Sequence, residues 1–201
     1  MAHYLIGAGG HAKVIYEILE ACSLKVAGVF DNDPGKSLFQ LPALEWDGYL
    51  RQEEDVFIIS IGNNTIRKKV AERDVPDAIA ATAVHPSANI SPRSIIGVGT
   101  VVMAGVTINA DARIGRHCII NTNASIDHDC VIEDFVHISP NATLTGNVQV
   151  GEGTQVGAGA VVIPGVKIGR WCVIGAGAVI LKDVPDNATV VGNPGRIIKI
   201  S

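Results

Sequence analysis

From Val84 onward, the apolar and polar positions of the chain repeat with a period of six residues. Seventeen consecutive hexads run to Pro185 without an insertion, and the first position of each is Val, Ile or Leu. The fifth position is Ala, Ser, Thr, Cys or Val in every hexad. A repeat of this regularity indicates a solenoid, in which successive turns of chain stack on one another.

Each hexad fits a short strand of about four residues followed by a turn of about two. Three such units close one triangular coil, and the coils stack at the inter-strand spacing of about 4.8 Å. The aliphatic first position then points inward, with the small fifth position beside it. Cys118, Cys130 and Cys172 all stand at the fifth position, so we interpret them as small core residues and not as catalytic thiols.

The first 82 residues follow a different pattern, in which apolar strands alternate with amphipathic helices. The pattern predicts strands over residues 4–6, 25–30 and 56–61, and helices over residues 12–21 and 65–72. Such an alternation is typical of a βαβ domain with a parallel sheet. We therefore divide the chain into a βαβ domain (1–82), a repeat domain (83–186) and a C-terminal tail (187–201).

A glycine-rich turn joins the first predicted strand to the first predicted helix. Gly7, Gly9 and Ala12 match the dinucleotide fingerprint in its alanine form, and Asp31 follows Ala12 by 19 residues. Glycines let a diphosphate approach the N–H groups of a helix N-terminus, and an acid at Asp31 would meet a ribose hydroxyl. A tight turn without a ligand is the alternative. The domain is only half a Rossmann fold, which suits a mononucleotide better than NAD.

Composition narrows the function classes further. The 201 residues are 47% apolar and 18% charged, which excludes a disordered chain, and the net charge of −4 argues against a nucleic-acid or anionic-membrane binder. No apolar run approaches the roughly 20 residues that span a bilayer. The N-terminus lacks a basic leader, and the four cysteines show no Cys-x-x-Cys pair. We expect a cytoplasmic protein with reduced thiols.

The hexads over residues 84–186 resemble the left-handed parallel β-helix of hexapeptide-repeat acyltransferases. The segments GAGGHA (7–12), FDNDP (30–34) and IGNNTIRKK (61–69) are similar to those of the PglD/NeuD family of nucleotide-sugar acetyltransferases. The resemblance therefore spans the chain. It implies a half-Rossmann domain joined to a left-handed β-helix in a homotrimer, without a metal, that acetylates a nucleotide-linked, UDP-4-amino sugar from acetyl-CoA for bacterial glycan biosynthesis.

The resemblance implies a catalytic group at His128, with Asp129 as its supporting acid and Asn121 in the same pocket. His128 is the third residue of its hexad, at a corner of the triangle, and has Asp127 and Asp129 on either side. A carboxylate bonded to one ring nitrogen fixes the tautomer and raises the basicity of the other. An amine attacking a thioester must lose a proton, which suits such a base. Asp127 is a rival to Asp129 for the supporting role.

The resemblance also implies residues that bind the two substrates. For acetyl-CoA they are His137 near the thioester, with Ala158 and Ala176 along the pantetheine arm. For the nucleotide sugar they are Gly9, Gly10 and His11 at the diphosphate or sugar, and Asp31, Asn32 and Gly62 around the nucleoside. His85 and His117 are interpreted as structural.

The same sequence features leave other functions open. One branch of the family implies an O-acetyltransferase acting on sialic acid, and GDP or dTDP sugars could fit a similar pocket. γ-Class carbonic anhydrases share the fold, but their His-x-x-x-x-His pair of zinc ligands is absent, because His117, His128 and His137 are separated by 11 and 9 residues. A non-catalytic, sugar-binding trimer is a further alternative.

Overall fold

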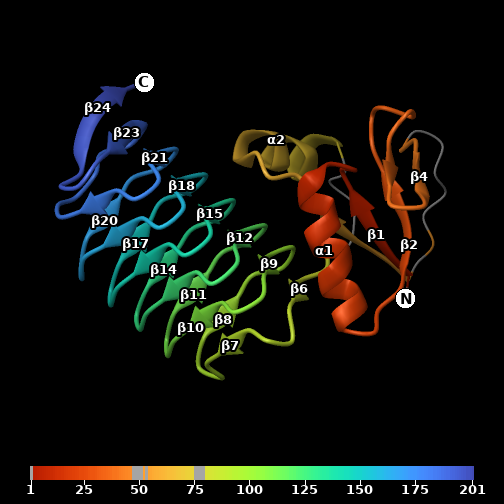
Figure 1. Cartoon of the computed structure of the whole chain (residues 1–201), viewed down its shortest axis with the longest axis horizontal. Coiled ribbons are helices and arrows are strands. Elements are labelled where there is room, and N and C mark those ends of the chain that lie inside the picture. Colours follow the sequence, from red (N-terminus) through yellow and green to blue (C-terminus); the bar gives the residue numbers. More distant parts are fainter. Residues whose placement is uncertain (1, 47–51, 53, 75–79) are drawn as a thin grey trace.

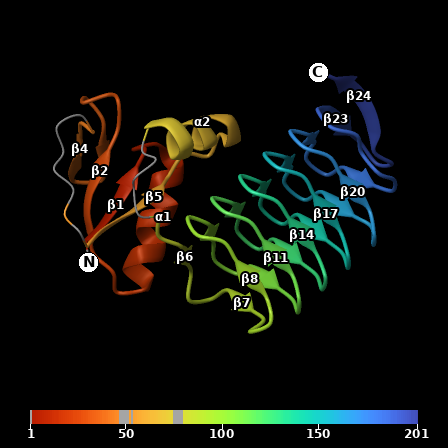
Figure 2. The same cartoon turned by 180° about the vertical axis from the view of Figure 1, so that it is seen from behind.

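The computed structural model describes residues 2–46, 52, 54–74 and 80–201. Two parts lie side by side, an N-terminal α/β region and a parallel β-solenoid of stacked coils (Figures 1 and 2). Helix α1 stands between the sheet of the first part and the first coils of the second. No helix in the described ranges has both the length and the apolar character needed to cross a membrane.

The N-terminal region carries a five-stranded sheet in the order β3-β4-β2-β1-β5. Its elements are β1 (Ala2–Ile6), α1 (Gly10–Ala21), β2 (Val26–Phe30), β3 (Ser37–Leu38), β4 (Leu41–Leu44), β5 (Asp55–Ile59), α2 (Asn64–Lys69) and the π-helical turn η1 (Val70–Asp74). The pairs β1–β2 and β1–β5 are parallel, as predicted. The β3–β4 hairpin was not predicted, and the helix expected over 65–72 is divided between α2 and η1.

Helix α1 joins the two parts through its apolar side. Ile15, Ile18 and Leu19 are buried in one cluster with sheet residues and with Val101 and Ile119 of the solenoid. The opposite face of the sheet has its own aromatic cluster, in which rings of β1, β2 and β5 pack together. Burial of both faces explains why β5, all five residues of which are buried, is continuously apolar from Val56 to Ile59.

The solenoid consists of three parallel sheets, and every strand between β6 and β22 pairs in parallel with the strand one coil away. The eight-stranded sheet has the order β24-β23-β21-β18-β15-β12-β9-β6, the six-stranded sheet β22-β19-β16-β13-β10-β7, and the five-stranded sheet β20-β17-β14-β11-β8. The strands of the coils are β6 (Ala83–Val84), β7 (Asn89–Ile90), β8 (Ile95–Ile96), β9 (Val101–Val102), β10 (Thr107–Ile108), β11 (Arg113–Ile114), β12 (Ile119–Ile120), β13 (Ser125–Ile126), β14 (Val131–Ile132), β15 (His137–Ile138), β16 (Thr143–Leu144), β17 (Gln149–Val150), β18 (Gln155–Val156), β19 (Val161–Val162), β20 (Lys167–Ile168), β21 (Val173–Ile174) and β22 (Val179–Ile180).

The hexad pattern predicts the interior correctly. From Val102 to Ile180, no first-position side chain is more than 3% exposed, and the fifth-position side chains lie buried beside them. Cys118, Cys130 and Cys172 are buried free thiols, and burial raises the pKa of Cys118 to about 12. The regular strands are two residues long instead of about four, because each coil turns a corner every six residues.

The corners share one backbone conformation. Every fourth position of a hexad from Gly99 to Gly177 has a positive φ, a region that glycine, Asn and Asp adopt most readily. The tail expected over 187–201 adds two strands, β23 (Ala188–Val191) and β24 (Arg196–Ile200), which extend the eight-stranded sheet.

The corners form three edges of the solenoid, each named here by the sheets it joins. Edge A leads from the eight-stranded to the six-stranded sheet, edge B from the six-stranded to the five-stranded sheet, and edge C from the five-stranded to the eight-stranded sheet. Edge A contains Asn121, Ala158 and Ala176; edge B contains His128, Asp129 and Gly146; edge C contains His117, Phe135, Gly153 and Trp171.

Candidate functional site

His128 and Asp129 form an exposed pair on edge B. The Nδ1 atom of His128 lies 2.7 Å from Oδ2 of Asp129, and both side chains are 60% exposed. This hydrogen bond, followed by the charge of Asp127, raises the pKa of His128 above its usual value. Because Nδ1 is engaged by the carboxylate, Nε2 is the nitrogen left to accept a proton.

Asp127 has a different position. Its Oδ1 atom accepts hydrogen bonds from Asn109 Nδ2 at 2.9 Å and from the backbone N–H of His128 at 2.8 Å. These contacts fasten the turn and involve no atom of the imidazole. Of the two flanking acids, Asp129 is therefore the one that the fold places against the ring.

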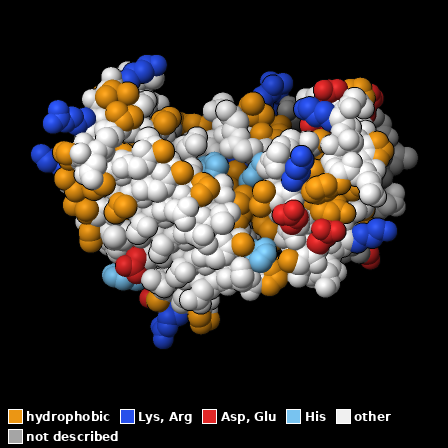
Figure 3. All heavy atoms as spheres, in the orientation of Figure 1, with side chains coloured by type: hydrophobic (Ala, Val, Ile, Leu, Met, Phe, Trp, Pro, Cys, Tyr) orange, Lys and Arg blue, Asp and Glu red, His pale blue; other side chains and the backbone are white. Residues whose placement is uncertain are grey.

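A second histidine cluster lies where the solenoid meets the N-terminal region. His137 Nε2 is 3.0 Å from Asn121 Nδ2, and the ring also forms a hydrogen bond with the backbone of Gly62. Burial, with smaller contributions from the charges of Arg67 and His11, lowers the pKa of His137 to about 4. Burial likewise lowers the pKa of His11 to about 4. Both rings are therefore neutral at ordinary pH, and Figure 3 shows histidine side chains at the surface of this junction.

The structure divides the predicted solenoid residues between two edges. Asn121, which was expected in one pocket with His128, contacts His137 on the other side of the six-stranded sheet. Ala158 and Ala176 share edge A with Asn121 and are exposed. A Cβ atom placed on the neighbouring Gly159 or Gly177 would meet nothing within 4 Å, so this part of edge A has small side chains and open space beside it.

The glycine-rich turn brings together the predicted nucleotide residues. Asp31 Oδ2 accepts the backbone N–H of Ala8 at 2.8 Å, and its Oδ1 pairs with Lys36 Nζ at 3.0 Å. Burial opposes ionisation of Asp31, but these hydrogen bonds outweigh it and lower the pKa of the carboxyl. Gly7 has a φ of 108°, and a Cβ there would lie 2.8 Å from Cγ1 of Ile61. Glycine is required at that position by both criteria.

The N-terminus of α1 is open beside this turn. Gly9 and Gly10 are exposed, and a Cβ atom placed on either glycine, or on Gly62, would meet nothing within 4 Å. No side chain forms a capping hydrogen bond with the first turn of α1. Asn32 is exposed next to Asp31. The sequence-predicted nucleotide residues thus lie around one open helix terminus.

Arg67 is a residue that the sequence reasoning did not single out. It is 1% exposed, and it donates from Nε to His117 O, from Nη1 to Ile61 O and Gly62 O, and from Nη2 to Asn64 Oδ1 and Phe135 O, at 2.8 to 3.2 Å. All five donors of the guanidinium are used. Burial lowers the pKa of Arg67 to about 10, so it stays charged at neutral pH and fastens the Gly62 loop to edge C.

Edge C is shaped to receive α2. His117, Phe135 and Trp171 stand at fourth positions with φ values of 52°, 60° and 53°, which bulky residues rarely adopt. Lys68 pairs with Glu152 and lies 5.8 and 5.6 Å from the ring centres of Phe135 and Trp171. The motif IGNNTIRKK (61–69) contains the residues that bind edge C, but only its glycine, Gly62, was assigned a role from the sequence.

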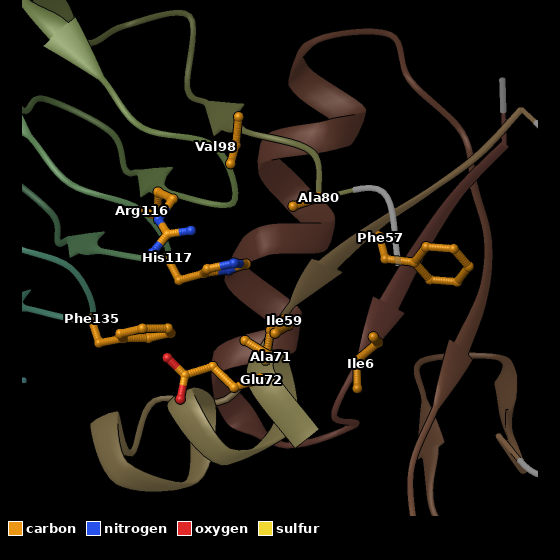
Figure 4. Close-up of a pocket in the computed structure, with 10 residues that line it drawn as sticks. All are labelled: Ile6, Phe57, Ile59, Ala71, Glu72, Ala80, Val98, Arg116, His117 and Phe135. Carbon is orange, nitrogen blue, oxygen red and sulfur yellow. The ribbon is translucent and has the colours of Figure 1, made fainter. Parts of the chain in front are cut away.

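A cavity of about 290 Å³ lies between η1, the sheet and edge C (Figure 4). Its lining is Ile6, Phe57, Ile59, Ala71, Glu72, Ala80, Val98, Arg116, His117 and Phe135. Arg116 is paired with Asp134 at 2.8 Å, and the ring of His117 stacks on Phe135 at 5.4 Å. None of the residues predicted for substrate or cofactor lines this cavity, so it is separate from the site described above.

Comparison with known proteins places these features in a family. The PglD N-terminal domain family matches residues 4–73, and the bacterial transferase hexapeptide family matches residues 111–146 and 147–182. Perosamine N-acetyltransferase from Caulobacter crescentus is 40% identical, with a TM-score of 0.94 over 99% of this chain and 97% of that one. The chain belongs to the PglD/NeuD family of nucleotide-sugar acetyltransferases.

Two further relatives agree with this assignment. The acetyltransferase domain of PglB from Neisseria gonorrhoeae is 36% identical, with a TM-score of 0.92 over 98% of both chains. UDP-N-acetylbacillosamine N-acetyltransferase from Bacillus subtilis is 47% identical over 110 residues, which are 50% of this chain and 50% of that protein. The sequence comparison thus spans about half the length of that curated relative.

The family assignment confirms the predicted enzyme class, an acetyl-CoA-dependent sugar N-acetyltransferase with hexapeptide repeats. The Caulobacter structure is a complex with CoA and GDP-perosamine, and the Neisseria structure is a complex with acetyl coenzyme A. Within the described part of this chain, no three His, Cys, Asp or Glu side chains gather in a way that could hold a metal ion.

Proposed function

We propose that this chain transfers the acetyl group of acetyl-CoA to the amino group of a nucleotide-linked sugar, with His128 as the general base. The observation that carries the proposal is the His128–Asp129 pair, whose 2.7 Å contact occupies Nδ1 and leaves Nε2 to accept a proton, on a side chain that is 60% exposed. The family relationship supports the two substrates, because the Caulobacter relative binds CoA and GDP-perosamine.

The reaction requires one proton transfer on each side of a tetrahedral intermediate. The sugar amine attacks the thioester carbonyl and forms a C–N bond, and the nitrogen gives its proton to His128 Nε2. The carboxylate of Asp129 stabilises the imidazolium through Nδ1–H. The C–S bond then breaks, and the proton held by the imidazolium can pass to the departing CoA sulfur. The products are the acetamido sugar and CoA.

The open N-terminus of α1 is the proposed site of the sugar-nucleotide diphosphate. Gly9 and Gly10 let the phosphate oxygens approach backbone N–H groups, where the helix dipole favours negative charge. His11 faces the sugar, and Asp31, Asn32 and Gly62 surround the nucleoside. We favour UDP as the carrier. GDP is the second candidate, because the Caulobacter relative was solved with GDP-perosamine.

The active site is completed between copies of the chain. In one protomer, His128 lies on edge B, while Asn121, Ala158 and Ala176 lie on edge A, at opposite margins of the six-stranded sheet. In a homotrimer, edge B of one protomer faces edge A of the next, and acetyl-CoA lies between them. A closed ring of heterologous contacts brings such different edges together.

A substrate panel tests the proposed reaction directly. Purified protein is incubated with acetyl-CoA and UDP-, GDP- or dTDP-linked 4-amino sugars, and release of the CoA thiol is measured. We expect thiol release with one nucleotide carrier well above the rate with the matching acetamido sugar, which has no free amine. Nucleotide-sugar binding without thiol release would instead favour a non-catalytic sugar-binding protein.

Asp31→Ala is expected to weaken nucleotide-sugar binding by about 10- to 100-fold, since a lost hydrogen bond to a charged group costs roughly 1.5–3 kcal/mol. The carboxylate holds the N–H of Ala8, so its removal also loosens the glycine-rich turn. Calorimetry measures the Kd. Asp33→Ala is the control, because the Asp33 side chain accepts the backbone N–H of Gly35 in an exposed turn, and its own backbone N–H, which donates to Asp31, is kept in the variant. Equal Kd values for both variants would place the pocket elsewhere.

Ala176→Trp is expected to raise the KM for acetyl-CoA by about tenfold or more, because an indole would fill the open space along edge A. Binding of the nucleotide sugar should stay unchanged, since that site lies at α1. Steady-state kinetics with each substrate varied separates the two effects. Gln149→Trp adds the same bulk on the exposed five-stranded sheet and serves as the control. Equal losses for both substrates would show that the cofactor groove is misplaced.

A further inference from the structure

We infer that Gly146 is a positioning residue for His128, because the lack of a side chain at position 146 lets the imidazole lie against the next coil. Position 146 is one coil further along edge B, directly beside His128. The inference rests on the proposed function, since it assigns Gly146 a role in holding the proposed base.

The space that a side chain at 146 would fill is occupied by the imidazole. A Cβ atom built on Gly146 would lie 2.6 Å from Cε1, 2.7 Å from Nε2 and 3.3 Å from Nδ1 of His128. These are its three nearest heavy atoms, and two of the distances are under 3.0 Å, a separation that real Cβ atoms essentially never show. The Cε1–Nε2 side of the ring therefore lies in the space that a side chain at position 146 would take.

The backbone itself does not require glycine at this position. Gly146 is absent from the residues with positive φ, which on the solenoid corners fall at fourth positions. It is a third-position residue, and the third position holds a residue with a Cβ in all sixteen other hexads. On edge B, the same position is Ala110 one coil before His128 and Pro164 one coil after Gly146. The feature that distinguishes position 146 is the imidazole of His128, which lies against it from the preceding coil.

The coil cannot move aside to make room for a side chain. Asn147 N donates to His128 O at 2.9 Å, and Gly165 N donates to Gly146 O at 3.0 Å, so the backbones of these three coils are fixed to one another. The imidazole is the movable partner, because it ends a rotatable side chain that is 60% exposed. A methyl group at 146 would turn the ring outward and separate Nδ1 from Asp129. The ring is thus held by the carboxylate on one side and by bare backbone on the other.

Gly146→Ala separates this role from a structural one. We expect kcat to fall at least about tenfold, towards the rate of His128→Ala, because the base leaves its position. We also expect the pKa of His128, followed by NMR titration of the imidazole, to fall towards 6.5 as the Asp129 contact is lost. The melting temperature should be unchanged or higher, since alanine restricts the unfolded chain more than glycine does. A purely structural role would lower the melting temperature and leave the pKa unchanged.

The double variant His128→Ala/Gly146→Ala provides the control that tests the coupling. If Gly146 acts through the imidazole, adding Gly146→Ala to His128→Ala should change the residual rate by less than about twofold. Pro164→Ala, at the same corner one coil further, should leave kcat and the pKa of His128 at their native values.

Three results would overturn the inference: native kcat and native pKa in Gly146→Ala, a lower melting temperature in that variant, or an equal further loss in the His128→Ala background. Native turnover in His128→Ala would contradict the proposed function instead. In that case the NMR titration of Gly146→Ala still decides whether position 146 places the ring.

Discussion

His128→Ala is expected to lower kcat by about 10²–10⁴-fold, the usual effect of removing a general base, with small changes in the affinity of either substrate. The side chain is exposed on edge B and supports no part of the solenoid interior, so the variant should fold normally. Steady-state kinetics with acetyl-CoA and the preferred amino sugar measures the loss. His85→Ala, which removes an imidazole that bonds to Ser87, is the matched control.

The pH profile makes this test more specific. The base must be neutral to accept a proton, so the rate should fall as the pH drops through the pKa of His128. Because the hydrogen bond to Asp129 and the charge of Asp127 raise that pKa, the acid limb should lie above the ordinary histidine value of about 6.5. Asp129→Asn should move the limb to lower pH and reduce kcat less than His128→Ala does. Native turnover in His128→Ala, together with loss of activity in His137→Ala, would show that His128 is not the base.

The interior of the solenoid could be predicted from the sequence because burial leaves a periodic record. A first position such as Ile126 must be aliphatic and a fifth position such as Cys130 must be small, whatever the rest of the chain does. The same periodicity places His128 at a corner, and its neighbour Asp129 is close enough to contact the ring. Which of Asp127 and Asp129 contacts the ring could not be predicted, since it depends on how one turn directs the two carboxylates.

The contacts between the two parts of the chain could not be predicted from the sequence pattern. Several of the hydrogen bonds at this junction run from α2 to backbone carbonyls, such as those of His117, Phe135 and Gly153, and every residue has a carbonyl. No residue type on edge C therefore identifies the acceptors in advance. The pairing of Asn121 with His137 was missed for a related reason. Residues 16 apart lie on neighbouring coils, and their contact follows from the way the coils stack.

The buried guanidinium at this junction leads to the second large expected effect. Arg67→Met should lower the free energy of unfolding by about 2–5 kcal/mol, because each buried acceptor that loses its donor costs roughly 1–3 kcal/mol and water can satisfy only some of them. Methionine keeps much of the apolar volume and removes all five hydrogen bonds. Urea denaturation measures the loss. Lys69→Met, an exposed position on the same helix, should change stability by no more than about 0.5 kcal/mol.

Arg67→Met should also affect catalysis, because Arg67 holds the Gly62 loop that contacts His137. Loosening that loop moves the proposed nucleotide site relative to edge A, so KM should rise for both substrates even under conditions where the protein is fully folded. Arg67→Lys should have a stability and KM values between those of the native protein and Arg67→Met. An ammonium offers three donors and cannot span the carbonyls that the guanidinium joins. If Arg67→Met has the same urea midpoint of unfolding and the same KM values as the native protein, Arg67 does not hold the two parts together. The apolar face of α1 would then be sufficient to do so.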